Sequence, residues 1–481
     1  AMTVGRKNAC YVDMTDSDII TSLAGNCSGL SATVDATTIT YPELVQYHCS
    51  DWDFLLARAE ANGMVVISDG NTLTVQAPNV SAASALVVTY GIDMMDFHAE
   101  LDARAQYATV KTASWDPASQ QITEQQATPQ AFTAQGNIES GTLAQVLALN
   151  EFRLQSNAAL PSSALTAWAK AQQLKAQMAR IRGHVSFQGS ALAKIGGVMD
   201  LAGVGDRFNG TVYVSGVTHT FSDGNWVTRV DFGLAPTWFT ERHELAARPA
   251  SGLTAGISGL QIGVVKKLDA DPEGHHKVQV SVPLMEGGDK GVWARLAKFY
   301  ASSSFGAFFL PEIGDEVILG FINDDPSNPV ILGSLYSSSR NPPYTLAAEN
   351  NTKAIVTRSK LKLIFDEEKK KITLITPANN KIVIDDDGKS ILIEDQTKNK
   401  VELNTGGITL DSPKDIKINA KGKVTIDAGM NVEITAKADI KEGATNITHT
   451  AKVGFTAKGS ATAELSAGGN TTVKGAMVMI N

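Results

Sequence analysis

The last quarter of the sequence consists of short aliphatic pairs separated by polar and charged residues. The first pairs are Ile372/Leu374, Ile382/Ile384, Ile391/Ile393, Val401/Leu403 and Ile408/Leu410. In a strand, this alternation places the aliphatic side chains on one face and Lys, Asp, Glu, Thr or Asn on the other. From Ile408 to Ile440 the same phase returns every eight residues, which is an internal repeat. Each strand therefore needs a partner surface that covers its aliphatic side.

Two architectures supply that surface. In the first, three copies of the chain associate around an axis, with the aliphatic side chains inward and each strand hydrogen-bonded to neighbouring chains. In the second, one chain forms a β-solenoid whose coils have three eight-residue sides. We favour the trimer, because the repeat runs on to the end of the chain and the region from Lys360 onward contains no Trp or Tyr, which a narrow axis has no room for. The predicted axis core is Ile408, Leu410, Ile416, Ile418, Val424, Ile426, Val432 and Ile434.

Length and charge limit the remaining possibilities. With 481 residues the chain is long enough for about two to four domains. The net charge of −8 is spread without a basic arm or stripe, so we expect no nucleic-acid partner. Cys10, Cys27 and Cys49 have no metal-site spacing and are expected to be reduced thiols. The sequence has no membrane-length apolar run and no signal-peptide pattern at its start, so we expect synthesis in the cytoplasm.

Residues 1–247 mix helical stretches with short alternating strands. One helix is predicted from a cap at Pro161-Ser162-Ser163 to a basic last turn at Arg180–Arg182, with Gly183 as its terminal glycine. A second is predicted from Trp52 to Asn62, after Asp51 and before Gly63. A hairpin is expected around 222–225, between strands at 211–214 and 226–230. The region is therefore expected to be an α/β domain.

Residues 248–259 are small and turn-rich, and they are predicted to be a linker. A compact all-β module is expected at 260–343, with a connector at 344–359 before the repeat region 360–481. Its predicted strands are 263–267, 277–282, 291–297, 305–310, 316–321 and 329–335. Five or six strands in about 80 residues suit a small barrel of the oligonucleotide/oligosaccharide-binding (OB) type.

The barrel region carries a long and specific motif, GAFFLPEIGDEVILGFINDDPSNPVILGSLYSSSRNPP, from Gly306 to Pro343. It resembles the barrel of VgrG-type spike proteins and phage baseplate spikes, in which a strand of the form Leu-Pro-x-x-Gly-Asp-Glu-Val precedes an Asp-Pro loop. The matching motif residues are Leu310, Pro311, Gly314, Asp315, Glu316 and Val317. Upstream, RGHVSFQG, VSGVTHTF and WVTRVDFGL resemble the hub domain of the same proteins.

The resemblance implies a mainly β, multidomain protein with an α/β hub, an OB-type barrel and a C-terminal triple-stranded β-helix formed by a homotrimer. It also implies a structural role as the central spike of a contractile injection apparatus, in an assembled and extracellular particle. Tube and baseplate proteins are the implied partners of the hub, and the target envelope is contacted mechanically. The hub is shorter than that of the family, which together with Ala1-Met2 predicts that the natural chain starts earlier.

The C-terminal residues Met477, Val478, Met479, Ile480 and Asn481 are apolar where a chain end is usually polar. Three copies of this end form a sizeable apolar platform. We predict that a separate tip protein, of the PAAR-like class in this family, docks there. The alternative is a self-closing plug.

No catalytic residue, metal or cofactor is predicted. Glu312, Asp315 and Glu316 fall on a turn and a strand start rather than on opposite walls of a cleft. His275 and His276 suit a solvated hairpin tip better than a metal site, whereas His449 leaves open an ion on the trimer axis. The alternative function is a trimeric tail-spike adhesin or an envelope-degrading enzyme on a β-stalk. The absence of Trp and Tyr after Lys360 argues against glycan binding there.

Overall fold

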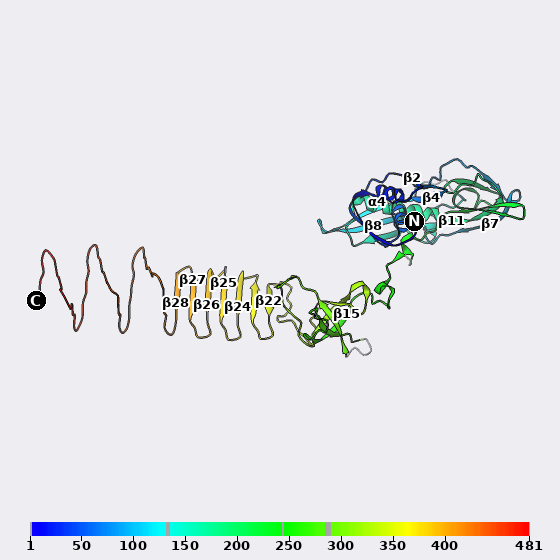
Figure 1. The fold of residues 1–481 in the computed structure, drawn as a ribbon. Coiled ribbons are helices and arrows are strands. Elements are labelled where there is room, and N and C mark those ends of the chain that lie inside the picture. Colours follow the sequence, from blue (N-terminus) through cyan, green and yellow to red (C-terminus); the bar gives the residue numbers. More distant parts are fainter. Residues whose placement is uncertain (1, 131–134, 243–244, 284–289, 481) are drawn as a thin grey trace. The chain divides into compact units, whose positions relative to one another are not determined.

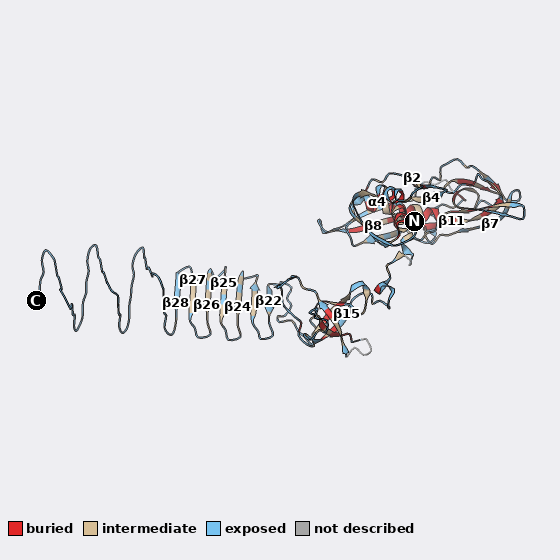
Figure 2. Cartoon of the chain, in the orientation of Figure 1, coloured by how far each residue is buried: buried red, intermediate tan, exposed pale blue. Residues whose placement is uncertain are grey.

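A computed structural model describes residues 2–130, 135–242, 245–283 and 290–480. The chain divides into two compact units, Ala1–Asn341 and Pro342–Asn481, and strands dominate both (Figure 1). The mainly β, multidomain fold expected from the sequence is therefore confirmed. Buried residues are concentrated in the first unit, whereas the strands of the second alternate between half-buried and exposed positions (Figure 2).

The N-terminal part packs two helices against two small sheets. These elements are α1 (Asp16–Gly25), α2 (Asp51–Ala61), β1 (Lys7–Thr15), β2 (Ser31–Val34), β3 (Thr40–Cys49), β4 (Val65–Asp69) and β5 (Thr72–Gln76). Thr15 caps α1 in a reciprocal capping box with Asp18, and Ser50 caps α2. Ile19, Ile20 and Leu55 are fully buried between the helices and the sheets. The predicted helix 52–62 is thus present, one residue earlier at each end.

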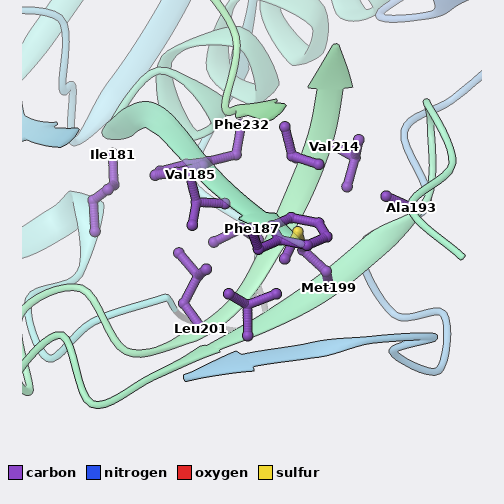
Figure 3. Close-up of a cluster of buried hydrophobic side chains, with 11 residues drawn as sticks. Ile181, Val185, Phe187, Ala193, Met199, Leu201, Val214 and Phe232 are labelled. Atoms are coloured by element: carbon purple, nitrogen blue, oxygen red, sulfur yellow. The ribbon is translucent and has the colours of Figure 1, made fainter. Parts of the chain in front are cut away.

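A six-stranded sheet forms the largest core. Its order is β6-β12-β13-β14-β11-β7, with β6 (Val87–Thr89), β7 (Met94–Leu101), β11 (Ile181–Gln188), β12 (Val198–Ala202), β13 (Gly210–Ser222) and β14 (Asn225–Phe232). Figure 3 shows Val185, Phe187, Met199, Leu201 and Phe232 pointing into one cluster. The predicted hairpin joins β13 and β14 through Asp223 and Gly224, whose φ angles of 51° and 76° suit a two-residue turn.

Helix α4 (Ser162–Met178) covers the three-stranded sheet β10-β8-β9, formed by β8 (Thr109–Asp116), β9 (Gln121–Ala127) and β10 (Glu151–Ser156). A short helix, α3 (Ser140–Val146), precedes β10. The predicted C-terminal end of α4 is wrong, because the helix stops at Met178 and Gly183 lies inside β11. A Cβ on Gly183 would lie 2.0 Å from the carbonyl oxygen of His98 in β7. This glycine therefore permits close strand pairing rather than ending a helix.

Arg180, predicted in the last helical turn, is instead buried after it. Its guanidinium donates hydrogen bonds to the carbonyl oxygens of Gln135 (2.6 Å) and Ile138. Burial lowers the pKa of this guanidinium. The side chain thus ties the segment before α3 to the end of α4.

The closed barrel has the strand order β15-β16-β17-β21-β20. Its strands are β15 (Gln261–Lys267), β16 (Val278–Ser281), β17 (Val292–Leu296), β20 (Glu316–Phe321) and β21 (Pro329–Ser334). Val265, Leu319 and Ile331 fill its centre without exposure to solvent. The barrel strand predicted at 305–310 is wrong. Phe305–Gly306 form β19, which pairs with β18 (Ala301–Ser302) in a separate two-stranded sheet, and residues 307–310 form no strand.

Part of the predicted linker 248–259 is folded. The turn η3 (Pro249–Gly252) buries Ala250, and the N–H of Ile257 donates to the carbonyl oxygen of Asp324 (2.8 Å) in η5 (Ile322–Asp324). A further 3₁₀ turn, η1 (Phe239–Glu241), lies before this segment. The small residues of 248–259 therefore allow close packing on a barrel loop, as well as a connection.

The second unit begins with a seven-stranded antiparallel meander, β22 to β28 in sequence order. The strands are β22 (Thr352–Val356), β23 (Lys362–Asp366), β24 (Lys371–Ile375), β25 (Lys381–Asp385), β26 (Ser390–Glu394), β27 (Lys400–Asn404) and β28 (Gly407–Asp411). Figure 1 shows them as a regular ladder. These strands pair within one chain, so the prediction that each strand pairs with neighbouring chains is wrong for 352–411. The sheet also starts inside residues 344–359, which were predicted to be a connector.

The meander repeats every 19 residues. β22, β24 and β26 begin at Thr352, Lys371 and Ser390, and the left-handed turn residues Lys360, Asn379 and Lys398 have the same spacing. Beyond it, residues 412–480 contain no helix or strand within one chain and are almost entirely exposed. The eight-residue repeat lies mostly in this part.

Candidate functional site

One face of the β22–β28 meander is apolar along its whole length. Consecutive strands bring the aliphatic residues into two cross-strand columns. The first column is Ile355, Leu363, Leu374, Ile382, Ile393, Val401 and Leu410. The second is Phe365, Ile372, Ile384, Ile391, Leu403 and Ile408. We call these thirteen residues the apolar face.

Among the described residues of the single chain, the members of the apolar face are partly to largely exposed. Its central members, such as Ile384 and Ile393, are 41% and 47% exposed, and at the last strand Ile408 reaches 74%. A regular sheet with one continuous apolar side is not stable in water unless a second surface covers that side. The apolar face is therefore an interaction surface.

The opposite face carries ladders of ion pairs near the strand ends, on either side of a central row that includes Ile364, Thr373, Val383, Leu392 and Glu402. The ammonium of Lys371 lies 2.8 Å from the carboxylate of Asp385, and that of Lys381 lies 3.2 Å from Glu394. The hydrogen bond from Lys371 lowers the pKa of Asp385. Such partly buried surface pairs add little stability individually, but opposite charges on facing residues favour this strand register. The two faces thus define an inside and an outside.

The turns at one end of the strands are built on side-chain hydrogen bonds. Asp395 accepts hydrogen bonds from the side chains of Asn399 and Thr397 (both 2.8 Å) and from their backbone N–H groups (2.9 and 2.8 Å). These bonds lower the pKa of Asp395 to about 2. Asn399 in turn accepts from the hydroxyl of Ser412 (2.5 Å), which links this turn to the next segment.

Stability of the meander is therefore expected to depend on the charge of Asp395. Because folding lowers the pKa of this carboxyl, its contribution is complete above its unfolded value near pH 4 and is lost as the pH falls toward about 2. Asp395→Asn should melt below the parent protein at about pH 7, and the two should converge near pH 2. Circular dichroism melts across this range measure the difference. As a matched control, Asp387→Asn changes a carboxylate in the opposite turns and should not show this pH-dependent difference from the parent protein. A difference in melting temperature for Asp395→Asn that stays constant with pH would contradict the expectation.

The predicted axis residues lie in two different settings. Ile408 and Leu410 belong to the apolar face on β28, whereas Ile416, Ile418, Val424, Ile426, Val432 and Ile434 lie exposed in the strandless part. Of the predicted tip residues, Met477, Val478, Met479 and Ile480 are 50% to 91% exposed, and Asn481 lies outside the described residues. Both assignments stay predictions.

The barrel motif residues shape the start of β20. Val317 is fully buried in the barrel, and Pro311 is also buried. The carboxylate of Asp315 accepts from the N–H of Glu312 (2.8 Å) and pairs with Arg340 (2.6 Å). Gly314 adopts a φ of +84° in this turn, while Leu310 and Glu316 flank it. These contacts give the Asp315 carboxylate a structural role in the turn.

Within the described residues, no group of three or more His, Cys, Asp or Glu side chains could hold a metal ion. His275 lies at an exposed turn organised by Asp271, which accepts from the N–H groups of Glu273, His275 and Lys277. His449 lies 3.5 Å from Glu442 and stacks on Phe455. Among the described residues, no helix is long and apolar enough to cross a membrane.

Sequence reasoning missed the first two strands of the apolar face, with Ile355, Leu363 and Phe365. The available signal was the 19-residue spacing of Thr352, Lys371 and Ser390, which a search for eight-residue periods does not detect. It also missed the exposed aromatic residues between β17 and β20, because the run from Phe305 to Leu310 predicts a strand of the barrel.

Comparisons with known families match three parts of the chain. Residues 1–223 match the Alg8 N-terminal domain, and residues 261–336 match the type VI secretion system/phage-baseplate injector OB domain. Residues 371–438 match the phage baseplate V C-terminal trimerisation domain. The second match covers the closed barrel, and the third extends from β24 past the end of the meander.

Curated relatives come from bacterial secretion systems. The actin cross-linking toxin VgrG1 of Vibrio cholerae is 30% identical over 132 residues, which are 26% of this chain and 11% of that protein. The type VI secretion system spike protein VgrG3 of Vibrio cholerae is 38% identical over 64 residues, which are 13% of this chain and 6% of that protein. The matched segments therefore span only a small part of these relatives.

Among solved structures, one similar chain is the E. coli c3393 protein, a component of the type VI secretion system. It is 12% identical with a TM-score of 0.30, and the match covers 69% of this chain and 75% of that one. A tail protein from Neisseria meningitidis is 12% identical with a TM-score of 0.38, covering 50% of this chain and 72% of that one. The barrel and trimerisation-domain matches, together with the named spike proteins, carry the assignment. The chain therefore carries an injector OB domain and a phage baseplate trimerisation domain, and it is similar in part to VgrG spike proteins.

Proposed function

We propose that three copies of this chain form the central spike of a contractile injection apparatus, which caps the tube and punctures the target envelope. The observation that carries the proposal is the uncovered apolar face of β22–β28. It begins in strands before the trimerisation-domain match and continues into it as far as β28. Three such sheets, facing one another around an axis, bury all three faces and leave the ion-pair ladders in water.

This arrangement suits a part that carries axial load. Each strand from β23 to β27 is hydrogen-bonded on both sides within its own chain. The chain continues beyond β28 into residues 412–480, where the eight-residue aliphatic repeat has no partner within one chain. We propose that in the trimer these residues form interchain strands, so that no edge remains to peel away.

The hub and the C-terminal end complete the proposal. We propose that residues 1–247 contact tube and baseplate proteins, and that Met477–Asn481 dock a tip protein of the PAAR-like class. The exposure of Met477, Met479 and Ile480 at 80% to 91% supports the docking surface. The spike acts within an assembled, extracellular particle in this proposal, and its action is mechanical rather than enzymatic.

The decisive experiment measures mass and shape together. Sedimentation of the intact protein should give three times the 51.0 kDa chain mass, and this species should resist dissociation by detergent. Negative-stain images should show a threefold head with one thin needle. A monodisperse single chain, or a globular particle without a needle, would contradict the spike.

The docking proposal has a separate test. Deleting Met477–Asn481 should leave the trimer mass unchanged and abolish binding of a PAAR-like tip protein in a pull-down. Retention of the tip protein by the deletion variant would remove the docking surface and leave the spike itself unaffected.

A further inference from the structure

The segment between β17 and β20 carries a dense group of exposed aromatic side chains on the barrel. Phe299, Tyr300, Phe305, Phe308 and Phe309, which we call the aromatic strip, are 90%, 56%, 61%, 85% and 55% exposed. At these exposures, five aromatic side chains present on the order of 700 Å² of apolar surface. That area exceeds the largest patch of a typical soluble monomer, about 300–600 Å². The strip therefore has the size of an interface.

The aromatic strip is held rigidly by the barrel. At its start, the N–H of Ala297 donates to the carbonyl oxygen of Ile331 (2.9 Å), and at its end Pro311 is buried beside the Asp315–Arg340 pair. Within it, Gly306 lets the two short strands approach. A Cβ on this glycine would lie 2.7 Å from the carbonyl oxygen of Tyr300, and the rings of Tyr300 and Phe305 lie 5.9 Å apart. A surface fixed in this way loses little entropy when a partner binds.

Charge and tethering indicate what covers the strip. Residues 299–311 contain no charged side chain, between Lys298 and Glu312. A surface without charged side chains can be buried against another protein surface without leaving a charge unpaired. Only seventeen residues separate the end of β21 at Ser334 from the start of β22 at Thr352, a reach of at most about 60 Å. Trimerisation of the meander therefore holds three barrels at high effective concentration.

We propose that the aromatic strip packs against the barrel of a second copy of the chain, so that the trimer is held at the barrels as well as at the shaft. The area per copy is close to the roughly 800 Å² that each partner buries in a stable interface. The inference rests on the proposed trimer, and it adds a second contact that is independent of the apolar face.

Hydroxyl-radical footprinting of the intact protein tests the contact. Phe221, which lies on β13 and is 71% exposed, is the internal reference, because Phe299 and Phe308 are more exposed than it in the single chain. In a particle of three chains, Phe299 and Phe308 should be oxidised several-fold more slowly than Phe221. In the Ile384→Asp variant, which is designed to separate the chains, their oxidation should rise to at least the rate of Phe221. Val383→Asp, a trimeric control, should keep the protection.

Each other outcome overturns the inference. Fast oxidation of Phe299 and Phe308 in a confirmed trimer excludes the second copy, and protection that appears only after a tube protein is added assigns the strip to that protein. Equal protection in trimer and separated chains means that the same chain covers the strip. A single-chain mass for the parent protein is a different result, since it contradicts the proposed spike itself.

Discussion

Replacing Ile384 with aspartate is expected to convert the trimer into single chains. Ile384 lies in the middle of the apolar face, between Ile372 and Ile391 in the second column. In a trimer the substitution places three carboxylates near the axis without partners, and each costs several kcal/mol whether it remains charged or takes up a proton. Sedimentation should therefore show the mass falling from three chains to one.

Val383→Asp is the matched control. It introduces the same side chain one residue earlier in β25, on the opposite face, which carries the ion-pair ladders, beside Thr373 and Leu392. In the single chain Val383 is more buried than Ile384. If the substitutions acted only on the folding of the isolated sheet, Val383→Asp would therefore be the more damaging of the two variants. The trimer should persist in Val383→Asp. Equal masses for both variants would contradict the inward orientation of the apolar face.

The orientation of the shaft strands could be predicted from the sequence, but their pairing could not. Alternation of residues such as Ile382, Val383 and Ile384 determines which side chains share a face, because successive side chains in a strand point to opposite sides. Whether a strand pairs within or between chains depends on the turns. Those from 357 to 406 are two to five residues long and return the chain directly to its own neighbour. Beyond Asp411 the described chain forms no such hairpin.

Two predictions outside the shaft, the helix end at Gly183 and the strand at 305–310, are wrong for the same reason. In both, the same short sequence pattern can arise from more than one structure. Glycine after basic residues is typical of a helix end, yet Gly183 serves the close approach of His98 in β7. The run Phe305–Leu310 is as apolar as a buried strand, yet Phe308 and Phe309 are exposed. Neither a contact between distant strands nor an interface with another copy is encoded in the local pattern, so both become visible only in three dimensions.

A buried ion pair in the hub provides the second large effect. Asp16 is fully buried at the start of α1, and its carboxylate accepts hydrogen bonds from Nε (2.6 Å) and Nη2 (2.9 Å) of Arg58. Asn62 donates a further hydrogen bond to the same carboxylate (2.7 Å), and Arg58 also donates to the hydroxyl of Tyr41 (2.9 Å). The pair joins α1, α2 and β3 across the N-terminal core. Removing only one partner leaves the other charge buried without compensation.

Arg58→Leu is therefore expected to destabilise the hub by about 3–5 kcal/mol. In a domain of this size, that loss lowers the melting temperature by about 6–20 °C. The double variant Asp16→Leu/Arg58→Leu should recover much of the loss, because no charge remains buried, and Arg104→Leu, which breaks the exposed pair with Asp102, should have little effect. Calorimetry follows the hub transition while sedimentation follows the mass. Since the apolar face lies in the other unit, the trimer should survive in all three variants, and dissociation on loss of Arg58 would mean that the hub rather than the shaft holds the chains together.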